Sequence, residues 1–144
     1  MDKPGVLFVC IHNSARSQMA EAFLRQMAGD RFDVSSAGLD PTTINPLAIE
    51  VMKEEGIDIS ENQTKNVFNL YQEARLFRYV ITVCDESSSE RCPVFPGITH
   101  RLHWGFADPA SFTGSYEDRL AATRKVRDEI KKTIQDWLRG LDPD

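Results

Sequence analysis

The sequence predicts an α/β fold: a three-layer sandwich in which helices flank a four-stranded parallel sheet. Short apolar runs alternate along the chain with segments whose apolar residues recur at helical spacing. Two of these runs, Gly5–Cys10 and Tyr79–Cys84, are apolar or β-branched throughout, as expected of interior strands covered on both faces. With 144 residues, the chain is expected to form a single domain, 1–144.

The first half of the chain is predicted to contain two strands and two helices. Gly5–Cys10 is the first strand, and a helix follows from about Ser14–Ala28. Phe32–Gly38 is the second strand. The next helix starts at Asn45-Pro46, an N-cap followed by a proline at the first helical position. Gly56 is expected to end this helix, since glycine is the preferred C-cap residue.

The second half is predicted to contain two more strands and two more helices. A short helix spans Val67–Ala74, and the third strand is Tyr79–Cys84. Ile98–Trp104 is a weaker fourth strand. The last helix begins after Ser115, which with Asp118 resembles a capping box, and its apolar stripe continues to Gly140.

The segment from Cys10 to Arg16, here called the anion loop, is the first candidate for chemistry. A loop that enters a helix N-terminus presents unpaired N–H groups and the positive end of the helix dipole, which together favour an anion. A cation such as Arg16 is unfavourable there unless an anion is held. The same groups stabilise a thiolate, so we interpret Cys10 as a nucleophile, not as an ordinary buried strand cysteine.

The other residues of this stretch are expected to contact the anion or to shape the loop. Asn13 is expected to bridge loop backbone and to tolerate a positive φ. Ser17 has two open interpretations: its hydroxyl favours the first helical turn, or it hydrogen-bonds the Cys10 sulfur. The predicted substrate-binding residues are Ile11, His12, Asn13, Ser14, Ala15, Arg16 and Ser17.

Cys84 and Cys92 form a second candidate feature. One interpretation is a buried strand-end thiol and an unrelated surface thiol; the other, which we favour, is a pair that forms a disulfide. Their spacing matches no zinc pattern, so no metal site is expected. An odd count of three cysteines also argues for free or redox-active thiols over structural disulfides.

Asp108 is the third candidate. Asp108-Pro109 is a common turn dipeptide, but here it follows the fourth predicted strand. Ligands of parallel sheets bind at the carboxyl ends of the strands, so Cys10, Cys84 and Asp108 are expected to converge. A carboxyl group there can protonate a leaving oxygen. His12 belongs to the loop, whereas His100 and His103 are expected on a strand surface; none is assigned a catalytic role.

The composition excludes several other classes of protein. A net charge of −5 argues against a nucleic-acid partner, which requires a basic face. No stretch reaches the roughly 18 apolar residues that cross a membrane, and the apolar N-terminal run is too short for a signal peptide. We therefore expect a cytoplasmic monomer without a nucleic-acid or membrane partner.

The anion loop, followed by Ser17-Gln18-Met19-Ala20-Glu21, resembles the low-molecular-weight phosphotyrosine phosphatases. It is more closely similar to the thioredoxin-coupled arsenate reductases of that fold. The resemblance covers essentially the whole chain, including residues 35–38, residues 56–60 and Asp108-Pro109. The loop is common to both branches. The reductase is favoured by the Cys84 and Cys92 pair and by Ala110, where tyrosine phosphatases of this fold tend to have tyrosine.

The resemblance implies a thiol-dependent arsenate reductase. Cys10 would attack arsenate, which is held by the amides of residues 11–16 and by Arg16, with Asp108 as general acid. A Cys10–Cys84 disulfide would then pass to Cys84–Cys92, where thioredoxin reduces it, so no tightly bound cofactor is implied. The alternatives are a phosphatase that hydrolyses phosphate monoesters through a Cys10 phosphoenzyme, and a non-catalytic oxyanion- or redox-sensing module.

The resemblance also raises the question of a potassium ion. Some family members bind this ion near the loop through Asn13, Ser36, a threonine and an aspartate. Thr64 matches the threonine, but the acidic position falls on Asn66. This departure puts the potassium site in doubt.

Overall fold

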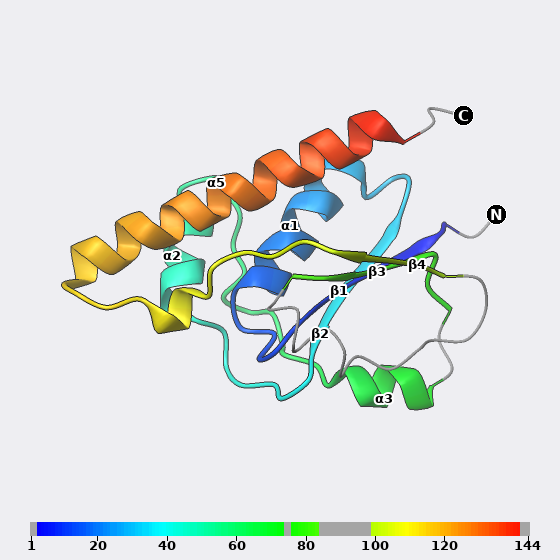
Figure 1. Cartoon of the computed structure of the whole chain (residues 1–144), viewed down its shortest axis with the longest axis horizontal. Helices are drawn as coiled ribbons and strands as arrows, with labels where there is room; N and C mark the ends of the chain where they lie inside the picture. Colours follow the sequence, from blue (N-terminus) through cyan, green and yellow to red (C-terminus); the bar gives the residue numbers. More distant parts are fainter. Residues whose placement is uncertain (1–2, 74–75, 84–98, 142–144) are drawn as a thin grey trace.

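The sheet of this protein has four parallel strands in the order β2-β1-β3-β4 (Figure 1). The computed structural model describes residues 3–73, 76–83 and 99–141. The strands are β1 (Gly5–Cys10), β2 (Asp33–Gly38), β3 (Tyr79–Thr82) and β4 (His100–His103). The prediction of a four-stranded parallel sheet is therefore confirmed, and β1 has the predicted bounds.

Helices cover both faces of the sheet and complete the three layers. On one face, α5 (Tyr116–Gly140) contacts both α1 (Arg16–Ala28) and α2 (Pro46–Lys53). The short α3 (Val67–Gln72) lies on the opposite face (Figure 1). A single 3-10 turn, η1 (Pro109–Ser111), follows β4. None of the helices in the described ranges has the length and apolar character needed to cross a membrane.

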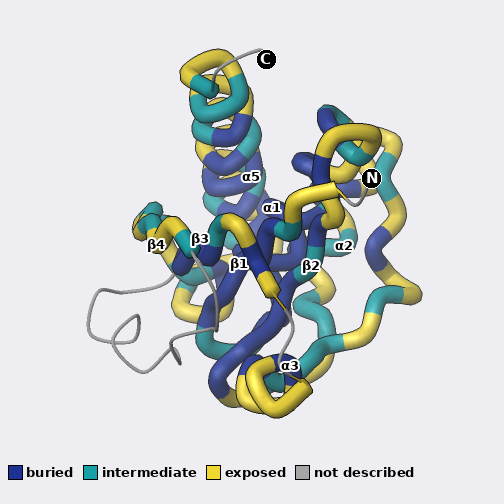
Figure 2. Tube along the Cα trace, turned by 90° about the vertical axis from the view of Figure 1, so that its right-hand side faces the viewer, coloured by how far each residue is buried: buried dark blue, intermediate teal, exposed yellow. Residues whose placement is uncertain are grey.

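Alternation along β1 divides the core in two and places Cys10. Leu7 and Val9 point to the α3 side, where they pack with Leu70 and Phe77. Val6, Phe8 and Cys10 point to the side of α1 and α5 and belong to the larger core. Figure 2 shows the central strands as buried and much of the outer surface of α5 as exposed. Cys10 therefore ends its strand directly beneath the start of α1.

The predicted helix ends are confirmed where local capping decides them. The Asn45 side chain accepts the Leu47 N–H at 2.8 Å. The Ser115 hydroxyl and the Asp118 carboxylate form a complete capping box at the start of α5. Regular α2 ends at Lys53, but Gly56 has φ +76° and closes the chain in a Schellman arrangement. In that arrangement the Ile57 N–H reaches the Met52 carbonyl at 3.0 Å.

Other predicted bounds were too wide. Helix α1 begins at Arg16, two residues later than predicted, because residues 11–15 form the loop that wraps the strand end. The second strand begins at Asp33, and β4 is confined to His100–His103. Helix α3 ends at Gln72, and β3 ends at Thr82. Ala74, Cys84 and Cys92 lie outside the described residues.

Candidate active site

The Cys10 sulfur lies at the end of β1 among hydrogen-bonding groups. Cys10 is only 2% exposed. Its Sγ lies 2.8 Å from Ser17 Oγ, and the Asn13 N–H donates to Sγ at 3.2 Å. Of the two interpretations of Ser17, the hydrogen bond to the Cys10 sulfur is confirmed.

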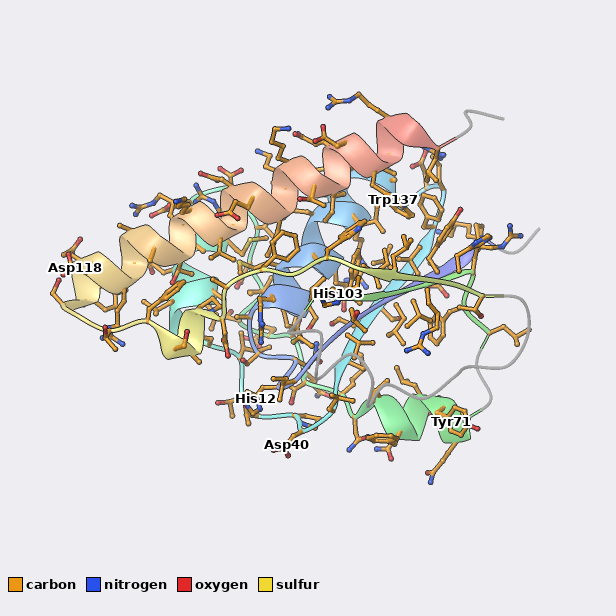
Figure 3. The ribbon with its side chains drawn as sticks, in the orientation of Figure 1. His12, Asp40, Tyr71, His103, Asp118 and Trp137 are labelled. Carbon is orange, nitrogen blue, oxygen red and sulfur yellow. The ribbon has the colours of Figure 1, made fainter. Side chains whose placement is uncertain are left out.

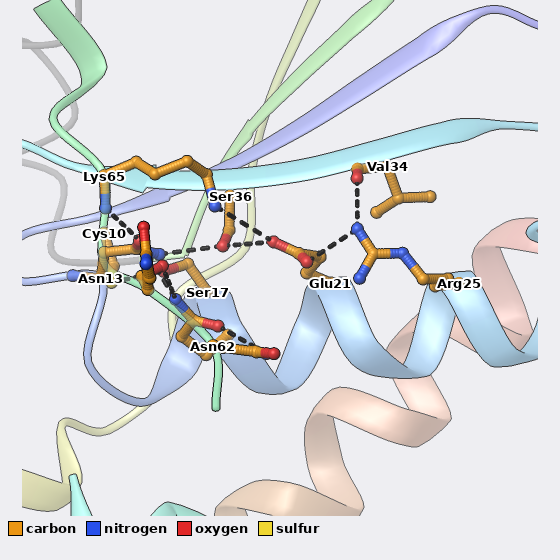
Figure 4. A network of polar contacts seen from close by, with 11 residues as sticks. Cys10, Asn13, Ser17, Glu21, Arg25, Val34, Ser36, Asn62 and Lys65 are labelled. Atoms are coloured by element: carbon orange, nitrogen blue, oxygen red, sulfur yellow. Dashed lines mark hydrogen bonds and ion pairs between the residues drawn. The ribbon is translucent and has the colours of Figure 1, made fainter. Parts of the chain in front are cut away.

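A chain of hydrogen bonds behind the sulfur connects Ser17 with Glu21 (Figure 4). The Ser36 hydroxyl donates to the Glu21 carboxylate at 2.6 Å, because an ionised carboxylate only accepts. Asn13 Nδ2 donates to the oxygens of Ser36 at 3.0 Å and Ser17 at 2.7 Å. Ser17 Oγ also contacts Cys10 Sγ, and either atom can be the donor of that hydrogen bond. Two hydrogen-bonding groups, the Ser17 hydroxyl and the Asn13 N–H, therefore contact the sulfur.

Asn13 is the centre of this arrangement. It is fully buried and has φ +54°, the left-handed conformation that asparagine tolerates. Its Oδ1 accepts the Gln18 Nε2–H at 3.2 Å and the Lys65 backbone N–H at 2.9 Å. These two donors fix the orientation of the amide, so the prediction that Asn13 bridges loop backbone with positive φ is confirmed.

The carbonyl groups of the anion loop are held by the segment that follows β2. Ile11, His12 and Ser14 accept the N–H groups of residues 40, 42 and 45 at 2.7, 3.0 and 2.8 Å. The His12 ring donates from Nδ1 to the Asp40 carbonyl at 2.9 Å, and Figure 3 shows these two residues side by side. In a trans peptide the next N–H points away from the carbonyl. In keeping with this, the Asn13 N–H, which follows the His12 carbonyl, points to Cys10 Sγ.

The start of α1 has no competing anion of its own. Its N-cap position is the buried Ala15, which offers no side-chain cap, and the first turn contains no acidic residue. Gly38 allows the loop to approach β2, because a Cβ there would lie 2.8 Å from both the Asn13 nitrogen and the Ile11 oxygen. The positive end of the helix dipole is thus available to an anion.

Arg16 connects the loop with the segment after β4. The arginine is 3% exposed, and it donates from Nη1 to the Phe106 carbonyl at 3.3 Å. Its Nη2 lies 3.5 Å from Asp108 Oδ2. The other oxygen of Asp108 accepts the Ala110 N–H at 3.0 Å and so starts the η1 turn. The predicted convergence of the anion loop and Asp108 at one edge of the sheet is confirmed.

A pocket of about 590 Å³ opens beside the anion loop. His12 and Ser14 of the loop form part of its wall. The remaining wall comes from residues 42–47, from η1 and from Tyr116 and Arg119 at the start of α5. A group attached to a bound oxyanion therefore has room next to the loop.

Sequence reasoning did not identify Glu21 and Lys65 as site residues. Glu21 is 5% exposed, and its carboxylate contacts Arg25 Nη2 at 2.8 Å and Lys65 Nζ at 3.9 Å. One signal was present: Ser17, Glu21 and Arg25 recur every four residues and therefore share one face of α1. Nothing local indicated that Lys65 joins them.

Cys84 and Cys92 lie outside the described residues, but the described chain ends close to Cys10. Val9 is paired with Thr82 in the parallel register of β1 and β3. The Val83 N–H donates to the Val9 carbonyl at 2.8 Å. The residue before Cys84 is therefore hydrogen-bonded to the residue before Cys10.

This chain is similar to known proteins in both sequence and fold. The family model described as low molecular weight phosphotyrosine protein phosphatase matches residues 5–144. The chain belongs to this family. Within the family, similar proteins support the resemblance to arsenate reductases. The arsenate reductase of Halalkalibacterium halodurans is 44% identical over 136 residues, which cover 94% of this chain and 95% of that protein.

Solved structures of the family agree. A structure described as an arsenate reductase in the phosphate binding state has a TM-score of 0.75 and 29% identity, and covers 96% of this chain and 99% of that one. The thioredoxin-dependent arsenate reductase of Corynebacterium glutamicum has a TM-score of 0.63 and 34% identity. That match covers 92% of this chain and 62% of the longer Corynebacterium chain.

Proposed function

We propose that this protein is a thiol-dependent arsenate reductase that reduces arsenate to arsenite and is regenerated by thioredoxin. The observation that carries the proposal is a cysteine sulfur, hydrogen-bonded with Ser17 Oγ and the Asn13 N–H, next to the N-terminus of α1, which no side chain caps. Two relatives of known name support the choice of reaction and of reductant: the Halalkalibacterium arsenate reductase and the thioredoxin-dependent enzyme of Corynebacterium.

In the first step the Cys10 thiolate attacks the arsenic atom. The loop N–H groups and Arg16 hold the arsenate oxygens, and Asp108 donates a proton to the oxygen that leaves as water. A sulfur–arsenic bond forms and an arsenic–oxygen bond breaks, while arsenic remains As(V). Binding of the anion would draw Arg16 from its contact with Asp108, which frees that carboxyl group for proton transfer.

The second and third steps move two electrons through the cysteines. The Cys84 thiolate attacks the Cys10 sulfur, the sulfur–arsenic bond breaks, and its electron pair stays on arsenic as arsenite leaves. The Cys92 thiolate then attacks Cys84, which releases Cys10 as a thiolate and leaves a Cys84–Cys92 disulfide. The contact of Val83 with Val9 supports this order, because it brings the chain that leads into Cys84 next to Cys10. Thioredoxin would reduce the final disulfide.

The test is a Cys92→Ser variant, in which the relay should stop after its second step. We expect one equivalent of arsenite per protein and a trapped Cys10–Cys84 disulfide, which mass spectrometry of the alkylated, digested protein identifies. The wild-type protein serves as the control and should oxidise NADPH continuously with arsenate, thioredoxin and thioredoxin reductase. Sustained turnover of the Cys92→Ser variant would contradict the relay.

A second candidate function is hydrolysis of phosphate monoesters through a Cys10 phosphoenzyme. The 590 Å³ pocket beside His12 and Ser14 favours it, because that space can take the organic group of an ester that arsenate lacks. This function requires neither Cys84 nor Cys92. Fast hydrolysis of an aryl phosphate that is unchanged in a Cys84→Ser/Cys92→Ser variant, without arsenate reduction by the wild type, would identify the protein as a phosphatase.

A further inference from the structure

The described residues do not fit the potassium site known from some relatives. Asn13 Oδ1 already accepts hydrogen bonds from Gln18 and from the Lys65 N–H. Asn66, which takes the acidic position, uses its Oδ1 to accept the Phe68 N–H at 2.8 Å as the N-cap of α3. A hard cation requires oxygen ligands that are free to bind it. Two of the expected ligand oxygens are instead committed to N–H donors.

A positive charge nevertheless lies where the Glu21 carboxylate requires one. A buried carboxylate is costly unless it is paired and hydrogen-bonded. Arg25 contacts Oε2 of Glu21 and is itself tied to the Val34 carbonyl at 2.7 Å, on the side away from the loop. The Lys65 ammonium is nearest to Oε1, the oxygen that accepts the Ser36 hydroxyl.

Lys65 is also fixed to the anion loop through its backbone. Its N–H donates to Asn13 Oδ1, and its carbonyl accepts the Gly38 N–H at 2.7 Å. The side chain therefore starts from a rigid point at the end of β2 and extends along the hydrogen-bond chain towards Glu21 (Figure 4). Its single positive charge offsets the Glu21 carboxylate on the side from which the chain leads to Cys10.

We propose that the Lys65 ammonium is a built-in monovalent cation that replaces a bound potassium ion beside the anion loop. Lys65 is a positioning residue: it acts through Glu21, Ser36 and Asn13 and does not touch the oxyanion. The inference rests on the proposed function only in requiring that the loop binds a tetrahedral oxyanion. It predicts that oxyanion binding by this protein is indifferent to potassium and becomes dependent on it when the ammonium is removed.

The test measures the dissociation constant of inorganic phosphate by isothermal titration calorimetry. Each protein is titrated in KCl and in choline chloride at about 0.1 M, so that screening is equal in the two salts. In choline, Lys65→Ala should bind phosphate about two- to fivefold more weakly than wild type, the range of a partly exposed ion pair. In KCl its affinity should return to that of wild type. The wild type should bind equally in both salts.

The matched control is Lys131→Ala. Lys131 has the same 39% side-chain exposure as Lys65 and pairs with Glu55 at 2.6 Å, but it lies on α5. This variant should bind phosphate like wild type in both salts, and Lys65→Arg should too. The proposal is overturned if Lys65→Ala binds normally in choline, if KCl does not restore its affinity, or if the wild type binds more tightly in KCl. Phosphate binding requires no arsenate reduction, so this result is independent of the proposed reaction.

Discussion

Two glutamates in this protein are each held by a pair of cationic side chains, and the two pairs serve different purposes. Glu54 lies just after α2 and faces α5, while Glu21 lies inside α1 and faces the anion loop. Arg124 grips Glu54 with two hydrogen bonds of 2.8 and 2.7 Å, and Arg127 adds a third of 2.8 Å. Glu21 has one cation contact of 2.8 Å, one of 3.9 Å and a bond to a serine hydroxyl.

The chemistry of the two carboxylates follows from these contacts. The hydrogen bond from Arg124, with that from Arg127, lowers the pKa of Glu54 from 4.5 to about 2, although partial burial opposes the shift. All of the charge of Glu54 is thus used to join α2 to α5. One oxygen of Glu21 accepts the neutral Ser36 hydroxyl, and the Ser36 oxygen accepts a hydrogen bond from Asn13. Glu21 is therefore connected through Ser36 and Asn13 to the sulfur. Close pairing with two arginines makes Glu54 a stabilising contact of the fold. The looser pairing of Glu21 leaves one of its oxygens to accept the Ser36 hydroxyl of the site.

The largest expected effect is that of replacing Cys10, at the end of the hydrogen-bond chain that connects it with Glu21. Cys10→Ser replaces a thiolate by a hydroxyl that neither ionises nor forms a disulfide. Arsenate-dependent NADPH oxidation should fall by at least about 10³-fold. The free energy of unfolding, measured in urea, should change by less than about 1 kcal/mol, because the side chains have nearly the same shape. Substantial remaining activity would show that the chain does not end on the nucleophile.

A smaller effect is expected from replacing Asn13, in the middle of this hydrogen-bond chain. Asn13→Ala removes the acceptor of Gln18 and of the Lys65 N–H, and it places alanine at a positive φ. We expect a loss of about 2–4 kcal/mol in urea unfolding and about tenfold weaker phosphate binding by calorimetry. Asn69→Ala, on the exposed surface of α3, is the control and should change neither quantity. Unchanged phosphate binding in Asn13→Ala would show that the hydrogen-bond chain does not contribute to anion binding.

Removing an arginine partner of Glu54 should affect stability alone. Arg127→Met keeps the aliphatic stem but removes the bonds to Glu54 and to the Val51 carbonyl at 2.9 Å. Because Arg127 is buried, we expect a loss of about 1–3 kcal/mol in urea unfolding, with arsenate turnover unchanged. Lys132→Met, which removes an exposed pair with Asp136 on α5, should cost less than about 0.5 kcal/mol. A fall in activity of Arg127→Met would remove the distinction between the two glutamates.

The smallest expected effect is the pH dependence of the stability that the ion pairs of Glu54 contribute. Glu54 has a lower pKa in the folded state than its ordinary 4.5, so its ionised form favours folding and the benefit is complete above about pH 4.5. As the carboxylate is a third exposed, we expect Glu54→Gln to be about 1 kcal/mol less stable than wild type at neutral pH. This difference should shrink as the pH falls from 4.5 towards 2. A difference that stays constant in urea unfolding across this range would exclude the ion pair as its source.

Local signals were sufficient to predict most of the framework. The apolar run of β1, the Asn45 cap of α2, the Gly56 turn and the Ser115 capping box all depend on residues within a few positions of one another. The anion loop was equally readable, because a cysteine, a helix start and an arginine within seven residues carry a chemical meaning by themselves. The convergence of the anion loop and Asp108 followed from the parallel sheet that this framework implies, whereas the strand order β2-β1-β3-β4 came only from the structure.

The start of α1 and the polar chain behind Cys10 were decided only by tertiary structure. Sequence periodicity extends the helix to Ser14, but the carbonyls of residues 11, 12 and 14 bond to the segment 40–45 and hold the loop open. The chain from Cys10 to Lys65 joins three parts of the sequence, residues 10–21, Ser36 and Lys65. The sequence by itself determined the anion loop and Cys10 as its candidate nucleophile, because their signals are local. Folding determined which distant side chains surround Cys10, because hydrogen bonds across 50 residues leave no periodic trace.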